Sequence, residues 1–228
     1  MPVKLFTWNL QGAGDKSGQS KAVTFKKLLA NADILCLQEC GDLGLQKDIN
    51  WKISPDDGKT VAVGEADGFA VYYYYWSERC NLALFFKGQK MMERYQFFLP
   101  DKETQRPVLG AQYNDVWIFS VHGPGKACNW EYCKSVLGYI NTFVSSGSKQ
   151  WIAAGDFNCD RDYLANKMWD FDIAFASSCG HSTHVTAGKE IDLVAYSPSI
   201  NVSKGECLKA KDGCEFSSDH TPMSFVVG

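Results

Sequence analysis

The sequence has no long hydrophobic run, and this absence argues against a membrane-spanning helix. No stretch of the 228 residues approaches the roughly 18 consecutive apolar residues that a membrane span needs. The start also lacks the pattern of a signal peptide, because Lys4 is followed directly by a short run that resembles a strand. We therefore expect either a mature chain or an export route that needs no such segment.

The sequence also has little net charge of either sign. Lys and Arg number 23 and Asp and Glu number 26, which gives a formal net charge of −3. This near balance excludes a broad basic coat for nucleic acid but leaves room for a local basic cleft. Hydrophobic residues make up 45% and charged residues 21%, as in an ordinary globular protein and unlike a disordered chain.

Cysteine is too sparse for a disulfide scaffold. The nine cysteines among 228 residues fall below the roughly 8–10% typical of that class, and no C-x-x-C pair suggests a zinc knuckle. The odd count leaves at least one thiol unpaired, and Cys36, inside an apolar run, is predicted to be a buried free thiol. The close pairs Cys128/Cys133 and Cys207/Cys214 are candidate disulfides, which favours an oxidising compartment.

No repeat, low-complexity tract or linker divides the chain, so we expect one domain over residues 1–228. Helical spacing predicts helices over 20–30, where Ser20 is a candidate cap, and over 130–144. Apolar or alternating runs predict strands over 3–8, 33–37, 69–76, 81–86, 108–113, 116–121, 151–154, 191–196 and 223–227. Residues 41–68 are predicted to be a surface loop. Hairpins together with helical crossovers indicate an α/β sandwich with mixed sheets.

Polar side chains that can bind metal or carry protons stand at the ends of these predicted strands. They are Asn9, Gln38-Glu39, His122, Gly155-Asp156-Phe157-Asn158, Asp192 and Ser218-Asp219-His220. Residues in such positions converge on one rim of a sheet. Asn, Asp and Glu offer the hard oxygen ligands of Mg²⁺, Mn²⁺ or Ca²⁺, and histidines can act as general acid and base. Without a candidate covalent nucleophile, the set predicts metal-assisted attack of water on a phosphate ester.

Two arginines, Arg79 and Arg106, are candidates for holding the non-reacting phosphate oxygens. Each residue also has an ordinary explanation when it is taken alone. A lone Asp after a strand is usually a turn residue or helix cap, and Arg79 could form a surface ion pair with Glu78. His181 and His184, in a loop rich in Ser, Thr and Gly, are interpreted as packed or surface residues. The prediction therefore rests on the whole set.

That ordered set resembles the endonuclease/exonuclease/phosphatase superfamily, whose fold is that of deoxyribonuclease I. The six motifs follow the order and spacing of the superfamily and extend from Asn9 to His220, nearly the whole chain. Segments 7–13, 79–84 and 106–110 are similar to those of the catalytic chains of cytolethal distending toxins. The resemblance implies a four-layer α/β/β/α sandwich of two mixed β-sheets with the helices outside.

The resemblance also implies a metal site. Glu39 would be the principal ligand of a Mg²⁺ ion, or of Mn²⁺ or Ca²⁺, with Asn9 and Asp219 close to the metal. Asp156 and Asn158 would bind or orient the attacking water, the phosphate or a second metal.

The same resemblance implies an acid–base pair. His220 would be a general base or a phosphate-binding group, oriented by Asp192. His122 would be its matching acid–base partner, with Glu78 behind it, and the two arginines would grip the substrate phosphate.

The substrate implied by the resemblance is DNA, cleaved by the catalytic subunit of a secreted toxin that acts inside a target cell. Separate delivery or carrier subunits would then be its partners. The first alternative is a phosphoinositide phosphatase of the same fold, and a cytoplasmic location is the alternative to secretion. An inactive binding protein on this fold is a third reading, disfavoured because Glu39, Asp156, Asp219 and both motif histidines are present.

Overall fold

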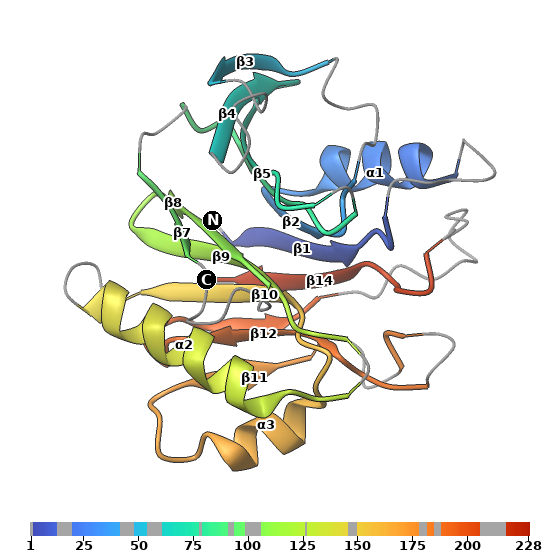
Figure 1. Cartoon of the computed structure of the whole chain (residues 1–228). Coiled ribbons are helices and arrows are strands. Elements are labelled where there is room, and N and C mark those ends of the chain that lie inside the picture. Colours follow the sequence, from blue (N-terminus) through green and yellow to red (C-terminus); the bar gives the residue numbers. More distant parts are fainter. Residues whose placement is uncertain are drawn as a thin grey trace.

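Two stacked β-sheets occupy the centre of the protein (Figure 1). The computed structural model describes residues 2–12, 20–41, 48–53, 61–77, 79–90, 94–98, 106–125, 127–145, 150–177, 182–184, 188–205 and 218–228. Eight strands form the first sheet in the order β13 (Val202–Lys204), β14 (Met223–Val227), β1 (Val3–Asn9), β2 (Ile34–Gln38), β6 (Leu82–Lys87), β5 (Phe69–Tyr74), β4 (Val61–Ala66) and β3 (Asn50–Ile53). Six strands form the second in the order β11 (Ala174–Ala176), β12 (Asp192–Tyr196), β10 (Trp151–Asp156), β9 (Val116–His122), β8 (Val108–Tyr113) and β7 (Tyr95–Phe98).

Both sheets are mixed, and their pairing already brings polar strand ends together. In the first sheet β1 runs parallel to β2, so that Asn9 lies opposite Gln38. In the second sheet β10 runs parallel to β9 and antiparallel to β12, so that Asp156 lies between His122 and Asp192. The polar residues therefore occupy one edge of the sandwich because the strand register places them there.

Three hydrophobic layers hold the sheets and helices together. The layer between the sheets joins Leu5, Cys36 and Leu84 of the first sheet to Ile118, Ile152 and Val194 of the second. Helix α1 (Ser20–Asn31) covers the outer face of the first sheet through Phe25 and Leu28. Helices α2 (Trp130–Ser145) and α3 (Arg161–Lys167) cover the second sheet (Figure 1). The predicted four-layer sandwich of two mixed β-sheets is thus confirmed.

The prediction that residues 41–68 lack regular structure is wrong. Strands β3 and β4 lie in this segment and extend the first sheet beyond β5. Gly64 lies within β4 and makes room for a neighbour, since a Cβ there would lie 2.5 Å from Ile49 Cγ2. Residues 42–47 and 54–60 of this segment lie outside the described residues.

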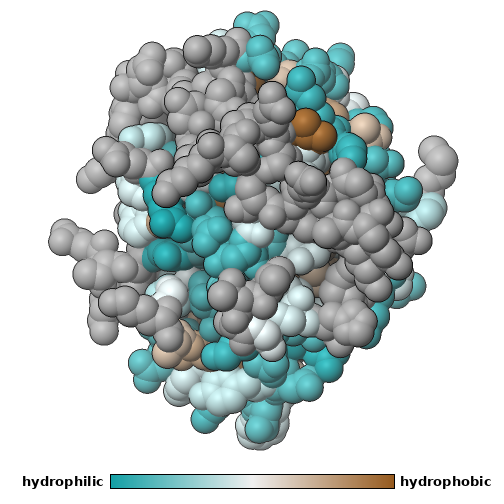
Figure 2. Space-filling view, turned by 90° about the vertical axis from the view of Figure 1, so that its right-hand side faces the viewer, coloured by the Kyte–Doolittle hydropathy of each residue, from teal (hydrophilic) through white to brown (hydrophobic). Residues whose placement is uncertain are grey.

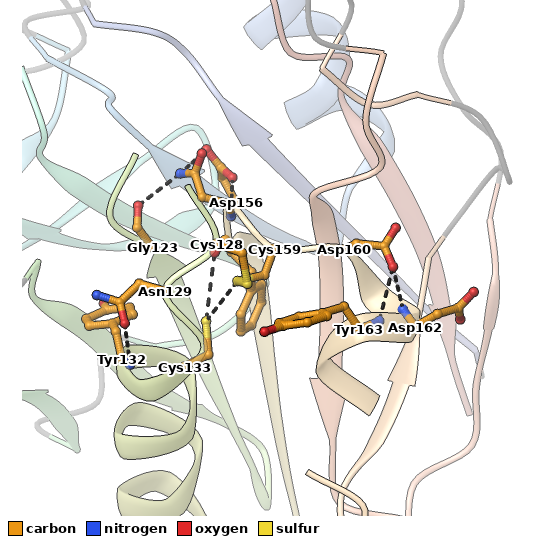
Figure 3. Close-up of a disulfide and its surroundings, with 12 residues drawn as sticks. Gly123, Cys128, Asn129, Tyr132, Cys133, Asp156, Cys159, Asp160, Asp162 and Tyr163 are labelled. Carbon is orange, nitrogen blue, oxygen red and sulfur yellow. Dashed lines mark hydrogen bonds between the residues drawn. A yellow bond between two sulfur atoms is a disulfide. The ribbon is translucent and has the colours of Figure 1, made fainter. Parts of the chain in front are cut away.

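The predicted Cys128/Cys133 disulfide is also wrong, because Cys128 is bonded to Cys159 (Figure 3). Cys133 lies on the first turn of α2 and points into the core, where its Sγ is 3.9 Å from Cys159 Sγ. Cys36 is free and fully buried, as predicted. Cys207 and Cys214 lie outside the described residues. Over the part of the chain that the structure describes, no helix is long and apolar enough to cross a membrane.

Candidate active site

The polar strand ends meet on one face of the sandwich. The parallel pairs β1–β2 and β9–β10 both end toward the right-hand side of Figure 1, and β12 begins there. Figure 2 views this side and shows hydrophilic side chains gathered at its centre. Both sheets contribute to the cluster, so its geometry depends on how the two sheets stack.

Asp156 lies at the middle of the cluster and is almost fully buried. Asn9 Nδ2 donates a hydrogen bond to Asp156 Oδ2 at 2.9 Å, and the Asn158 backbone N–H donates to Asp156 Oδ1 at 2.8 Å. Asn158 Nδ2 donates to the Gly123 carbonyl at 2.9 Å, and this hydrogen bond joins the loop after β10 to the loop after β9. Burial, and then the charge of Asp192, raise the pKa of Asp156 to about 7 despite the opposing effect of His220.

His220 is held by a buried carboxylate. Its Nδ1 donates to Asp192 Oδ2 at 2.8 Å, and its backbone carbonyl accepts a hydrogen bond from Trp8 Nε1 at 3.0 Å. Burial alone would lower the pKa of His220, but the charge and hydrogen bond of Asp192, followed by the charges of Asp156 and Asp219, raise it to about 9. The imidazole is therefore protonated at neutral pH, and its Nε2 lies 3.6 Å from Asp156 Oδ2.

His122 has the opposite environment. Its side chain is buried, and its Nε2 lies 3.3 Å from Glu39 Oε1 and 3.7 Å from Asp156 Oδ2. Burial, reinforced by the positive charge of Arg106, lowers the pKa of His122 well below its ordinary value. His122 Nδ1 has no hydrogen-bond partner within the described ranges, and Glu78, predicted to stand behind it, lies outside them. Two titratable groups pushed in opposite directions are the usual arrangement of a general acid and a general base.

The residues predicted to surround a metal offer hard oxygen atoms. Asn9 Oδ1 accepts from the Gln11 backbone N–H at 2.8 Å, and Gln11 Oε1 accepts from the Asp219 backbone N–H at 3.2 Å. Asp219 Oδ1 is buried and has no hydrogen-bond partner among the described residues, so it is available to a cation. With the Glu39 carboxylate, these are the hard oxygen atoms that suit Mg²⁺ or Mn²⁺, but the close clusters of candidate ligands among the described residues place Glu39 with Cys80 and His122, and Asp219 with His184 and His220.

Of the five described residues other than glycine with a positive φ angle, three lie at the same rim, and the other two, Asp67 and Asn114, lie in hairpin turns. Gln11, Glu39 and Asn158 have positive φ angles of 53°, 47° and 52°, a backbone conformation that residues other than glycine rarely adopt. Each is adjacent to, or is itself, a member of the polar cluster. Strained residues of this kind gather at functional sites because the surrounding structure holds them in place.

The two predicted phosphate-binding arginines differ in their surroundings. Arg106 is partly buried, and its Nη1 is buried with no hydrogen-bond partner in the described part of the chain. Its charge acts on His122, so it lies near the cluster with an unused donor. Arg79 Nε instead donates to Glu39 Oε2 at 2.6 Å. The guanidinium expected to grip phosphate therefore contacts the residue expected to bind metal.

Sequence reasoning missed two members of the cluster, Gln11 and His184. His184 Nε2 lies 3.3 Å from Asp219 Oδ2, and its ring packs edge-on against that of His220 with centroids 4.8 Å apart. The sequence carries no signal for this role, because His184 reaches the cluster through the fold, where it pairs with His220 in an isolated antiparallel bridge. His181 lies outside the described residues.

Comparison with known proteins gives a consistent result. The model of the Endonuclease/Exonuclease/phosphatase family matches residues 6–220. A Salmonella typhi homolog of the B component of cytolethal distending toxin is 25% identical over 255 residues, which cover 98% of this chain and 89% of that protein.

Solved structures share the fold. The cytolethal distending toxin of Actinobacillus actinomycetemcomitans superposes with a TM-score of 0.78 at 22% identity, covering 98% of this chain and 97% of that one. The Haemophilus ducreyi toxin gives a TM-score of 0.77 at 21% identity, with coverage of 98% and 97%.

Proposed function

Because the chain belongs to the endonuclease/exonuclease/phosphatase family, we propose that it is a divalent-metal-dependent deoxyribonuclease, the catalytic subunit of a toxin of the cytolethal distending type. The Salmonella typhi relative, named as a homolog of a toxin component, supports the toxin assignment. The observation that carries the hydrolase assignment is geometric: the Nε2 atoms of two buried histidines, His122 and His220, lie 3.7 Å and 3.6 Å from Asp156 Oδ2. Their surroundings shift the two pKa values in opposite directions, which supports it.

In this proposal Glu39, Asn9 and Asp219 would hold a Mg²⁺ or Mn²⁺ ion. The ion supplies Lewis-acid stabilisation of the charge that develops on the phosphate. Arg106 binds a non-reacting phosphate oxygen through its unpartnered Nη1.

The protein's own groups move the protons. His122, neutral at physiological pH, would accept the proton of the attacking water at Nε2, the ring nitrogen that faces Glu39 and Asp156. His220, protonated and oriented by Asp192, donates from Nε2 toward the phosphate or the leaving oxygen. Asp156 and Asn158, which are hydrogen-bonded directly to each other, would together orient the attacking water. This assignment makes His220 the acid, where the sequence suggested a base or a phosphate-binding group.

The test is relaxation of supercoiled plasmid by the purified protein with Mg²⁺, with EDTA as the metal control. We expect nicking that requires the metal and that falls by about 10²–10⁴-fold in His220→Gln, the usual contribution of general acid–base catalysis. Asp156→Asn should fall similarly. Asp33→Asn is the matched control, since Asp33 accepts a hydrogen bond from the Lys4 backbone N–H and precedes β2, at the opposite end from Glu39.

Absence of nicking over a wide range of enzyme would overturn the DNA assignment. Phosphate release from phosphoinositides under the same conditions would then establish the alternative substrate of this fold. We further propose that the chain is secreted and acts with separate delivery subunits inside a target cell. This proposal is supported by the Salmonella typhi toxin homolog alone.

A further inference from the structure

Arg79 and Glu39 form a close ion pair at the centre of the proposed metal site. Arg79 Nε lies 2.6 Å from Glu39 Oε2, and the other carboxylate oxygen, Oε1, lies 3.3 Å from His122 Nε2. The two groups that contact Glu39 differ in freedom, because the Arg79 side chain is 60% exposed and the His122 side chain only 2%. Any further ligand of this carboxylate can displace Arg79 far more easily than His122.

The chain is built to admit Arg79 at this position. Its side chain crosses Gly12, where a Cβ would lie 2.9 Å from Arg79 Cγ and 3.2 Å from Nε. The Gly12 backbone N–H donates to the Glu39 carbonyl at 3.0 Å, so a backbone hydrogen bond joins the two neighbours of the guanidinium. The charge of Asp219, another proposed metal ligand, also acts on Arg79 and adds to the effect of Glu39.

We propose that Arg79 and the divalent cation compete for the Glu39 carboxylate, and that cation binding releases Arg79 to bind the substrate phosphate. This inference rests on the metal site of the proposed function. A divalent cation and a guanidinium held on one carboxylate repel each other, and the exposed, flexible partner is the one that leaves. The released guanidinium keeps its charge and offers five N–H donors to phosphate oxygens. Metal loading and substrate binding are thereby linked through one side chain.

Equilibrium binding of Mn²⁺, followed by the electron paramagnetic resonance signal of the free ion, tests the competition without measuring activity. Arg79→Gln should bind Mn²⁺ about tenfold more tightly than the wild type, since one positive charge near the ion is removed. Arg79→Lys, which keeps the charge, should stay near the wild-type affinity. Arg161→Gln is the matched control, because Arg161 forms a similarly close ion pair, with Asp162, on α3 outside the polar cluster.

Equal or weaker Mn²⁺ binding by Arg79→Gln would overturn the competition, provided that Glu39→Gln still loses the ion. If Glu39→Gln instead keeps the wild-type affinity, the metal site of the proposed function is wrong, which is a separate failure. Binding of inorganic phosphate at saturating Mn²⁺ tests the second half. Arg79→Gln should bind phosphate several-fold more weakly than the wild type, and an unchanged affinity would show that the released guanidinium does not reach the substrate.

Discussion

At the scale of single residues, the chemistry depends on two histidines whose surroundings drive their protonation apart. His220 has a buried carboxylate on its Nδ1, whereas the charges that act on His122 include the positive charge of Arg106. The same side chain is therefore an acid in one position and a base in the other. The motif residues could be predicted from the sequence, but this division of roles could not, because it depends on contacts between elements far apart in the chain.

Replacement of Asp192 by Asn should reverse the protonation of His220. Without the carboxylate, burial dominates, and we expect the pKa of His220 to fall from about 9 to below 6.5, as followed by NMR titration of the EDTA-treated protein. Because the pKa of His220 is higher in the folded state than in the unfolded state, where it is near 6.5, protonated His220 stabilises the fold by about 3 kcal/mol below pH 6.5. This stabilisation is lost as the pH rises through 9. The loss of stability caused by the substitution should shrink over the same window. An unchanged titration of His220 in the variant would contradict this assignment.

At the scale of the elements, the close pairing of β9 and β10 sets the distance between His122 and Asp156. Gly155 makes this pairing possible, because a Cβ there would lie 1.9 Å from the Val121 carbonyl oxygen, a backbone atom that cannot move aside alone. Gly123 approaches the Phe157 carbonyl oxygen in the same way, at 2.3 Å. Gly123 follows His122 and Gly155 precedes Asp156. The ends of β9 and β10 can therefore approach this closely because neither glycine carries a side chain.

The Gly155→Ala variant should lose stability and activity together. The added methyl group forces β9 and β10 apart, and we expect a cost of about 1–3 kcal/mol in the free energy of unfolding, as for overpacked cores. Gly138→Ala is the control, since among the described residues its Cβ would meet only Phe171 Cε1, at 3.6 Å, and alanine favours the helix. Denaturant titration measures both variants. A Gly155→Ala protein with wild-type stability would show that β9 and β10 can separate at no cost.

The disulfide between Cys128 and Cys159 joins the loop after β9 to the loop after β10 (Figure 3). Closing a loop over a separation of 31 residues stabilises a fold by about 3–4 kcal/mol in the chain-entropy model. Cys128→Ser should therefore lower the melting temperature, and dithiothreitol should lower that of the wild type to a similar value. The variant itself should respond to dithiothreitol less than the wild type does, because the Cys128–Cys159 bond is no longer there to be reduced. A response of the variant equal to that of the wild type would place the sensitive bond elsewhere.

The elements that the sequence predicts well are those with a local signal. Helices α1 and α2 and the central strands follow the apolar patterns and end within a few residues of the predicted bounds. Strands β3 and β4 were missed because polar and turn-forming residues such as Pro55, Asp56 and Gly58 favoured one continuous loop over the whole segment. The partner of Cys128 was missed because spacing along the chain favoured Cys133, whose side chain the first turn of α2 directs into the core.

At the scale of the whole molecule, the site exists only because two sheets stack in one register. Asn9 and Glu39 belong to the first sheet or follow it directly, whereas His122 and Asp156 belong to the second. A buried polar bridge fixes the stacking close to the site, since Gln38 Nε2 donates to Ser120 Oγ at 2.9 Å and Ser120 Oγ donates to the Leu37 carbonyl at 3.0 Å. Stability of the layers and geometry of the site are thus coupled.

This coupling predicts that metal binding stabilises both sheets together. A ligand present at 100 times its dissociation constant stabilises the folded state by about 2.7 kcal/mol, so Mn²⁺ should raise the melting temperature in a concentration-dependent way. Because Asn9 and Glu39 are bonded to, or in contact with, Asp156 and His122 of the second sheet, protection of backbone amides from hydrogen exchange should rise at the ends of β1, β2, β9 and β10 alike. Glu39→Gln should abolish both effects. Protection that rises in the first sheet alone would mean that the cation is held without the second sheet, and the site would then not depend on the stacking.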